Sequence, residues 1–259
     1  MMMRGVGNRL LVVQAVDSFT AAPPLGKYAV TAEGVLRPPL QKSNGMNVFQ
    51  HLADGNYTAQ VLAEHYFPET VTVTVEALDP LYPVVIVPLT PKPSYPFAGE
   101  TTLIRASFMD EHGAPLSGMR VRGVAMSESC TKGKLSAEAE AGAKELALSR
   151  LNGRVRVGER YALGAETVTI AEAKEGSRTF FLTEPLAASH ARGVSLLPCA
   201  DTLTDGRGEV VLAFGNCRSA AFDVRLTVFH GEREFCREVR VEEGTLLNLR
   251  AVNLDDFAS

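Results

Sequence analysis

The chain of 259 residues contains no tryptophan, only 7% aromatic residues and no excess of basic residues, since its formal net charge is -4. Proteins that bind DNA or RNA normally have a basic surface, so nucleic-acid binding is not expected. Sugar-binding sites commonly use tryptophan or tyrosine as platforms, and six tyrosines provide few of them. No apolar run approaches the roughly 20 residues of a membrane-spanning helix, so membrane insertion is not expected either.

Cysteine is also scarce. The four cysteines Cys130, Cys199, Cys217 and Cys236 form no Cys-x-x-Cys pair and have no histidine at zinc-ligand spacing. We therefore expect no metal site and no cofactor. Whether these thiols are reduced or paired as disulfides stays open at this point.

Catalytic motifs are missing as well. The five histidines include no His-Glu-x-x-His pattern, and Ser195 lacks the second glycine of a nucleophile elbow. Gly133-Lys134 lacks the other residues of a phosphate-binding loop. No catalytic residue is predicted, and the sequence indicates a protein that is not an enzyme.

The N-terminal residues resemble a signal peptide only superficially. Arg4 and Arg9 precede an apolar run from Leu10 to Val16, but this run is short and leads to Asp17 instead of a cleavage site. We expect a strand here, in a chain that is cytoplasmic at synthesis and open to later incorporation into an extracellular or virion-like particle.

Alternation of apolar and polar residues at period two dominates residues 1–90. In Thr70–Val75 the valines lie on one face and the threonines on the other, and the turn dipeptide Asp54-Gly55 precedes a further alternating segment. Short strands at this spacing predict an antiparallel β-sandwich. The strands are predicted at residues 9–16, 28–33, 46–51, 56–63, 70–76 and 84–89.

Four prolines lie within nine positions from Pro88 to Pro96. Proline fixes φ and lacks an N–H donor, so residues 91–99 are predicted to form an extended polyproline II spacer between two domains. Residues 100–259 are predicted to form a second sandwich of the Ig-like or regulatory-like type. Its strands are predicted at residues 101–109, 119–126, 208–214, 222–229, 233–241 and 245–252.

A sandwich does not need all of these residues, so an insertion is expected near residues 127–190. Within it, Leu135–Leu151 is rich in Ala, Glu and Leu, lacks proline and predicts one short helix, although Gly142 opposes it. Further strands are predicted at 155–157, 166–170 and 179–183. The predicted fold class is thus mainly β, with two antiparallel sandwiches, a Pro-rich spacer and a helix-containing insertion.

The turn residues of the first domain follow a known pattern. Asp54-Gly55 leads into a strand beginning at Tyr57-Thr58, and Tyr66-Phe67-Pro68 leads into the next alternating strand. These residues resemble the carboxypeptidase regulatory-like domain, a seven-stranded transthyretin-like sandwich. Asp110–Gly118 and Thr204–Val210 resemble its turns more weakly. The resemblance implies non-enzymatic accessory domains of surface, secreted or assembly proteins, including phage-tail-like particles.

Two groups of side chains are predicted to bind a partner. The first is a group of arginines that forms the densest positive cluster of the sequence and suits binding of an acidic surface or a phosphate. The alternative is that these arginines are ordinary solvent-facing residues. The second is an aromatic pair in the spacer, which suits docking on a partner or, alternatively, packing between the domains. These residues are Arg150, Arg154, Arg156 and Arg160, and Tyr95 and Phe97.

The sequence therefore favours a non-enzymatic structural or adaptor protein whose β-sandwich domains contact other proteins in a larger assembly, either a phage-tail-like or a cell-surface particle. A module that binds a carbohydrate or peptide ligand is the alternative. A transthyretin-like hydrolase ranks third, because residues 248–256 lack the Tyr-Arg-Gly-Ser signature of those enzymes. The identity of the partner and the oligomeric state stay open.

Overall fold

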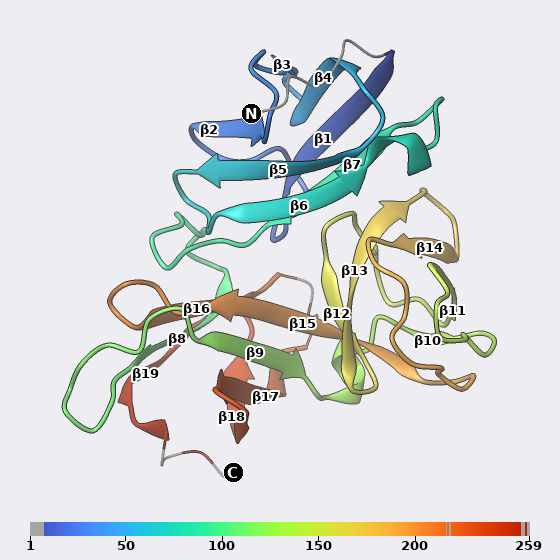
Figure 1. Cartoon of the computed structure of the whole chain (residues 1–259). Helices are drawn as coiled ribbons and strands as arrows, with labels where there is room; N and C mark the ends of the chain where they lie inside the picture. The colour runs from blue at the N-terminus through green and yellow to red at the C-terminus, as the bar shows by residue number, and fades with distance from the viewer. Residues whose placement is uncertain (1–7, 216, 218, 255–256, 258–259) are drawn as a thin grey trace. The chain divides into compact units, whose positions relative to one another are not determined.

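The computed structural model describes residues 8–215, 217, 219–254 and 257, and the chain divides into two compact units, residues 1–90 and 91–259 (Figure 1). Both units are built from β-strands. The helical elements among the described residues are two 3-10 turns, η1 (Val75–Ala77) and η2 (Glu128–Cys130). No helix in this part of the chain has the length and apolar character needed to cross a membrane.

The first unit packs two small sheets around an apolar core. Its strands are β1 (Arg9–Asp17), β2 (Tyr28–Ala32), β3 (Leu40–Gln41), β4 (Met46–Leu52), β5 (Asn56–Ala63), β6 (Glu69–Thr74) and β7 (Val84–Leu89). One sheet has the order β3-β4-β1-β7 and the other the order β2-β5-β6. Alternate residues such as Val13, Phe49 and Val61 point inward and are buried. Six of these strands match the predicted ones, and β3 is too short to show a pattern.

The second unit contains a larger sandwich. Its strands are β8 (Thr102–Phe108), β9 (Arg120–Ala125), β15 (Ser195–Leu203), β16 (Glu209–Phe214), β17 (Ala221–His230), β18 (Arg233–Glu242) and β19 (Leu246–Val252). The sheet β16-β8-β19 and the strands β15-β9-β17-β18 enclose a core that includes Ile104, Phe108, Leu212, Phe222 and Val224. Here too the predicted strands are present.

The two sandwiches share one strand connectivity. In each, the first strand lies between an antiparallel neighbour and the last strand of the unit, which runs parallel to it: β1 pairs with β7, and β8 with β19. The opposite sheets also correspond, as β2-β5-β6 and β9-β17-β18. The prediction of wholly antiparallel sandwiches is wrong at these two pairs. The last strand arrives by a connection from the opposite sheet, which permits parallel pairing, whereas a tight hairpin does not.

A closed barrel stands in place of the expected helix-containing insertion. It is formed by β10 (Gly133–Leu135), β11 (Glu145–Ser149), β14 (Thr179–Leu182), β13 (Glu166–Ala173), β12 (Arg160–Leu163) and the first half of β15, in that order. The pairing of β10 with β15 closes the ring. Apolar side chains fill its interior, among them Leu146, Leu163, Ile170 and Leu196, each fully buried.

The helix predicted over residues 135–151 is wrong. Leu146 and Leu148 are both buried and Ala147 between them is exposed, which is the period of a strand, and β11 pairs with β10 and β14. Gly142 lies in a turn at a φ of 87°. Composition favours a helix, but burial of alternate leucines in a closed ring overrides that weak local preference. The strand predicted at 155–157 is also absent, since these residues form a loop.

Residues 91–99 are not an extended polyproline II spacer. The N–H of Tyr95 donates to the carbonyl of Lys92 at 3.0 Å, and the N–H of Thr101 donates to Ala98 at 3.0 Å. Each bond closes a four-residue turn, and proline suits turns as well as extended chain. The segment therefore contains turns. It belongs to the second compact unit, residues 91–259.

The turn residues of the second unit meet at one corner of its sandwich. The hydroxyl of Thr204 donates to the carbonyl of Leu116 at 2.5 Å and accepts the N–H of Met119 at 2.9 Å. Gly208 has a φ of 74°, and its carbonyl accepts the N–H of Phe108 at 2.9 Å. These residues organise two loops, which is a structural role.

Substitution of Gly208 tests this corner. Gly208→Ala places a side chain at positive φ, where its Cβ collides with the carbonyl oxygen of Phe108. We expect the free energy of unfolding of the second unit to fall by about 2–4 kcal/mol. The measurement is urea unfolding of the full chain followed by hydrogen exchange of β8 and β16.

The matched control is Gly206→Ala, two residues away in the same loop. No atom lies within 4 Å of a Cβ built there, so a change of less than about 0.5 kcal/mol is expected. Equal effects of the two substitutions would contradict the described turn.

Candidate functional site

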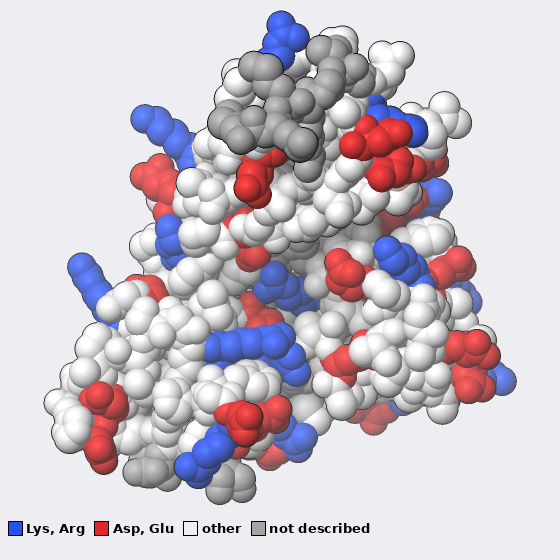
Figure 2. Space-filling view, in the orientation of Figure 1, with Lys and Arg blue, Asp and Glu red and all other residues white. Residues whose placement is uncertain are grey.

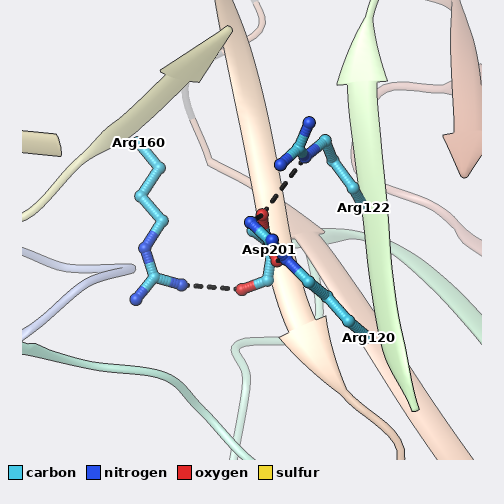
Figure 3. Close-up of polar contacts among 4 residues, drawn as sticks. All are labelled: Arg120, Arg122, Arg160 and Asp201. Atoms are coloured by element: carbon cyan, nitrogen blue, oxygen red, sulfur yellow. Dashed lines mark hydrogen bonds and ion pairs between the residues drawn. The ribbon is translucent and has the colours of Figure 1, made fainter. Parts of the chain in front are cut away.

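Three arginines converge on one aspartate at the junction of the sandwich and the barrel (Figure 3). Asp201 lies on β15, between β12 on one side and β9 on the other. Its carboxylate accepts Arg120 Nε at 2.8 Å and Arg120 Nη2 at 2.5 Å, a bidentate pair, and it also accepts Arg122 Nε at 3.2 Å. Arg160 Nη1 reaches the backbone carbonyl of Asp201 from β12 at 2.7 Å.

Strand register explains why these residues meet. Asp201 is directly opposite Arg122 in the β15–β9 pair. Arg120 is two residues before Arg122 and therefore lies on the same face of β9. This is the outward face, because Val121, between the two arginines, belongs to the core. Arg160 begins β12, at the end of the barrel that adjoins the sandwich.

A single carboxylate balances only part of this positive charge. The side chain of Asp201 is 9% exposed, and its hydrogen bond raises the pKa of Arg120, against the lesser opposing effect of burial. A guanidinium has five N–H donors. Within the cluster, two nitrogens of Arg120, one of Arg122 and one of Arg160 donate. The remaining donors and the net positive charge suit an incoming carboxylate or phosphate.

An aromatic ring orders the two arginines of β9. Phe229 on β17 lies directly opposite Arg120, and the guanidinium carbons of Arg120 and Arg122 lie 5.3 and 5.2 Å from its ring centroid. Both distances fall within the range of cation–π attraction. The side chain of Arg120 is nonetheless 48% exposed, and in Figure 2 a basic surface lies over β9 and β15. The cluster is thus ordered and accessible.

The predicted arginine group divides among different surroundings. Arg160 joins the Asp201 cluster, whereas Arg154, on the exposed loop before β12, pairs with Glu175 at 3.1 Å. Arg150 and Arg156 are also exposed, and Arg150 has a φ of 53° after the end of β11. Their role in partner binding stays a prediction.

The two aromatic residues of the predicted spacer contact each other with tilted rings. The ring centroids of Tyr95 and Phe97 lie 4.6 Å apart, Tyr95 is buried and Phe97 is half-buried. Burial leaves Tyr95 little surface to offer a partner. Partner binding by these two residues stays a prediction.

Arg120, Arg122 and Asp201 were not identified from the sequence. The local pattern Arg120-x-Arg122 in a predicted strand indicates two arginines on one face. Nothing in the sequence indicates that Asp201, about 80 residues later, faces them. Among the described residues, no group of three or more His, Cys, Asp or Glu side chains is placed to hold a metal ion.

A second group of polar contacts, around the half-buried Glu166, stabilises the barrel. Glu166, at the start of β13, accepts the N–H groups of Ala187 and Ala188 at 2.9 and 3.2 Å, and His190 Nε2 lies 2.6 Å from its Oε1. Burial raises the pKa of Glu166, but these hydrogen bonds outweigh it and lower the pKa below its ordinary value. The ionised carboxylate therefore stabilises the loop that carries Leu186 into the barrel core.

No family model matches the chain, and no curated protein matches it. Among solved structures, a streptococcal ancillary pilin is 10% identical, over 95% of this chain and 68% of that one, with a TM-score of 0.27. The shaft pilin SpaA of Lactobacillus rhamnosus GG is 10% identical, over 95% of this chain and 98% of that one, with a TM-score of 0.24. The major pilin subunit BcpA of Bacillus cereus is 9% identical, over 93% and 69%, with a TM-score of 0.26. With TM-scores this low, the likenesses define neither a family nor a function.

Asp201→Asn tests the arginine cluster. An amide cannot accept the bidentate pair or balance the guanidinium groups, so we expect the second unit to lose about 1–3 kcal/mol of unfolding free energy. The loss should be smaller at high salt, which screens the repulsion among the arginines. Hydrogen exchange of the β9 and β15 amides in the full chain, at low and high salt, measures this loss of unfolding free energy.

Asp223→Asn is the control, since Asp223 pairs with Arg240 on the outer face of β17 and β18 and its side chain is 50% exposed. We expect a change of less than about 0.5 kcal/mol. If Asp201→Asn has no larger effect than this control, Asp201 does not organise the arginines.

The lowered pKa of Glu166 predicts a pH dependence. Because the folded pKa of Glu166 is lowered, its contribution to stability is complete above the ordinary value of 4.5 and is lost as the pH falls through the lowered pKa. Glu166→Gln should cost about 1–2 kcal/mol at pH 7, and this difference from the unmodified chain should shrink below pH 4.5. Urea unfolding of both proteins across this pH range measures it.

Glu172→Gln on the same strand is the matched control, because the side chain of Glu172 is 42% exposed and pairs only with Lys174 nearby at 2.9 Å. A pH-independent cost of Glu166→Gln would argue against the ionised carboxylate as the stabilising form.

Proposed function

We propose that this protein is a non-enzymatic structural or adaptor component of a larger protein assembly, a phage-tail-like or cell-surface particle, and that it contacts an acidic partner through Arg120, Arg122 and Arg160. The observation that carries the proposal is the ordered arginine cluster on the outer face of a sheet. Arginine and aromatic residues are enriched where protein interfaces bind most strongly.

Preorganisation supports a binding role. Binding a partner immobilises exposed side chains at a cost of about 0.5–1.5 kcal/mol for each flexible one. The bidentate pair with Asp201 and the cation–π contact with Phe229 already restrict Arg120 in the unbound chain. Less of this cost therefore remains when a partner binds.

Charge determines the kind of partner. The chain as a whole has a net charge of -4, so a locally basic surface on it is distinct from its surroundings. An acidic protein surface, with carboxylates spaced for guanidinium groups, fits the available donors.

The proposed accessory role also agrees with the resemblance of the first unit to the carboxypeptidase regulatory-like domain. Gly55, in the motif turn, has a φ of 136°, and its N–H donates to Glu76 at 2.7 Å. The hydroxyl of Tyr57 donates to the carbonyl of Ala53 at 3.1 Å. These contacts give the motif residues a structural role, which supports an accessory domain.

The proposal is tested by the mass of the native particle. The full chain, tagged and purified from the cells that naturally produce it, is analysed by size-exclusion chromatography with light scattering and by electron microscopy. We expect a particle many times heavier than the 27.9 kDa chain. Arg120→Glu combined with Arg160→Glu should reduce the fraction in the particle at least tenfold.

The control is Arg9→Glu combined with Arg225→Glu, which alters the charge equally at exposed ion pairs. It should leave assembly unchanged. Recovery of the unmodified chain only as a monomer would exclude the assembly role. Equal loss of assembly in both double variants would exclude the specific arginine surface.

A further inference from the structure

Two cysteines that are far apart in the sequence meet in the core of the second unit. Cys130 ends η2, just before the barrel begins, and Cys217 follows β16, after the barrel has ended. Their exposed fractions are 1% and 3%, and both belong to one apolar cluster. The thiols of Cys130 and Cys217 hydrogen-bond to each other. Neither cysteine is in a disulfide, so both are reduced.

Neighbouring hydrogen bonds hold the two segments side by side. The hydroxyl of Ser129 donates to that of Ser219 at 3.1 Å. The N–H of Asp223 donates to the hydroxyl of Ser127 at 3.0 Å, and the N–H of Met126 donates to the carbonyl of Asp223 at 2.8 Å. The two sulfurs are therefore close because these hydrogen bonds hold residues 126–129 beside residues 219–223.

We propose that Cys130 and Cys217 form a disulfide site, which is oxidised in an oxidising compartment and then fixes the barrel to the sandwich. The chain enters the barrel after Cys130 and leaves it through β15 before Cys217. The cross-link thus closes a loop of about 90 residues that contains the whole barrel.

The surroundings distinguish the roles of the two sulfurs. The hydrogen bond with Cys217 lowers the pKa of Cys130 and outweighs the opposing effect of burial, and Ser129 and the buried Lys132 add to the lowering. The same hydrogen bond, together with burial, raises the pKa of Cys217. Once these contacts have formed, in a folding or locally opened chain, Cys130 is therefore the attacking thiolate and Cys217 the second thiol.

The oxidant is a low-molecular-weight disulfide such as oxidised glutathione. The Cys130 thiolate attacks one of its sulfurs, forms a mixed disulfide and releases one small thiolate, which takes up a proton. Cys217 then loses its proton and attacks the Cys130 sulfur, releasing the second small thiol. Two protein thiols are oxidised and one small disulfide is reduced to two thiols. Because both sulfurs are buried, this exchange takes place during folding or local opening.

The other two cysteines provide an internal control. Cys199 lies on β15 and Cys236 on β18, and β9 and β17 separate these strands in the sheet. Three strand spacings of about 4.8 Å place them roughly 14 Å apart, beyond the reach of a disulfide. Burial also raises the pKa of Cys199 to about 12, which keeps it a thiol.

The experiment refolds the full chain from urea in a buffer of oxidised and reduced glutathione, and in parallel in a fully reducing buffer. Free thiols are alkylated, and the digested peptides are analysed by mass spectrometry. We expect a peptide pair linked through Cys130 and Cys217, with Cys199 and Cys236 alkylated. Oxidation should raise the melting temperature of the second unit by about 10 °C.

Variants separate the cross-link from other effects of oxidation. Cys199→Ser combined with Cys236→Ser should keep both the linked peptide and the rise in melting temperature, whereas Cys130→Ser and Cys217→Ser should each abolish both. The comparison of oxidised and reduced unmodified chain requires no variant, so a folding defect in either single variant leaves the test intact. Alkylation of Cys130 and Cys217 after oxidative refolding, or linkage of either to Cys199 or Cys236, would overturn the proposal.

Discussion

The backbone of β15 is the constraint on which the second unit depends. Its first residues pair with β10 on one edge and β12 on the other, which closes the barrel, and from Cys199 onward it pairs with β9 in the sandwich. Pro198 lies where one edge changes partner from β10 to β9, the place in a strand where a missing N–H costs least. Disruption of this one strand would open the barrel and remove a strand from the sandwich sheet.

The arginine cluster is a consequence of that shared strand. Asp201 lies two residues beyond Cys199, at which pairing with β9 begins, so its carboxylate faces arginines of the sandwich while its carbonyl faces Arg160 of the barrel. Neither the sandwich nor the barrel alone assembles this charge arrangement. The carboxylate of Asp201 binds two of the three guanidinium groups and its carbonyl binds the third, yet positive charge and N–H donors remain for a further anion.

Period-two alternation is the part of the fold that the sequence predicts well, because burial of one sheet face demands it. Composition misleads in Leu135–Leu151, where good helix formers occupy strands and turns because closure of the barrel decides the structure. The bounds predicted for the strands at 222–229 and 233–241 are also slightly short: His230 pairs with Arg233, and the loop between β17 and β18 is only Gly231-Glu232. Arg160 could be found from local charge density, but its neighbours at the site come from strands 40 residues away in either direction. The density of charged residues along the sequence does not reveal contacts between distant strands.

The two sandwiches differ most at their third strand, and the site lies there. In the first unit this strand is β3, two residues long and paired with β4; in the second it is β15, nine residues long and paired with β9 in the opposite sheet. The barrel is inserted directly before β15, and its length gives the chain the freedom to cross between sheets before the third strand begins. Because β3 has no counterpart of Asp201 or of the arginines that surround it, the repeated framework does not give the two units the same surface. The proposed contact therefore belongs to the second unit, because it needs the inserted barrel and the long β15 in addition to the sandwich that both units share.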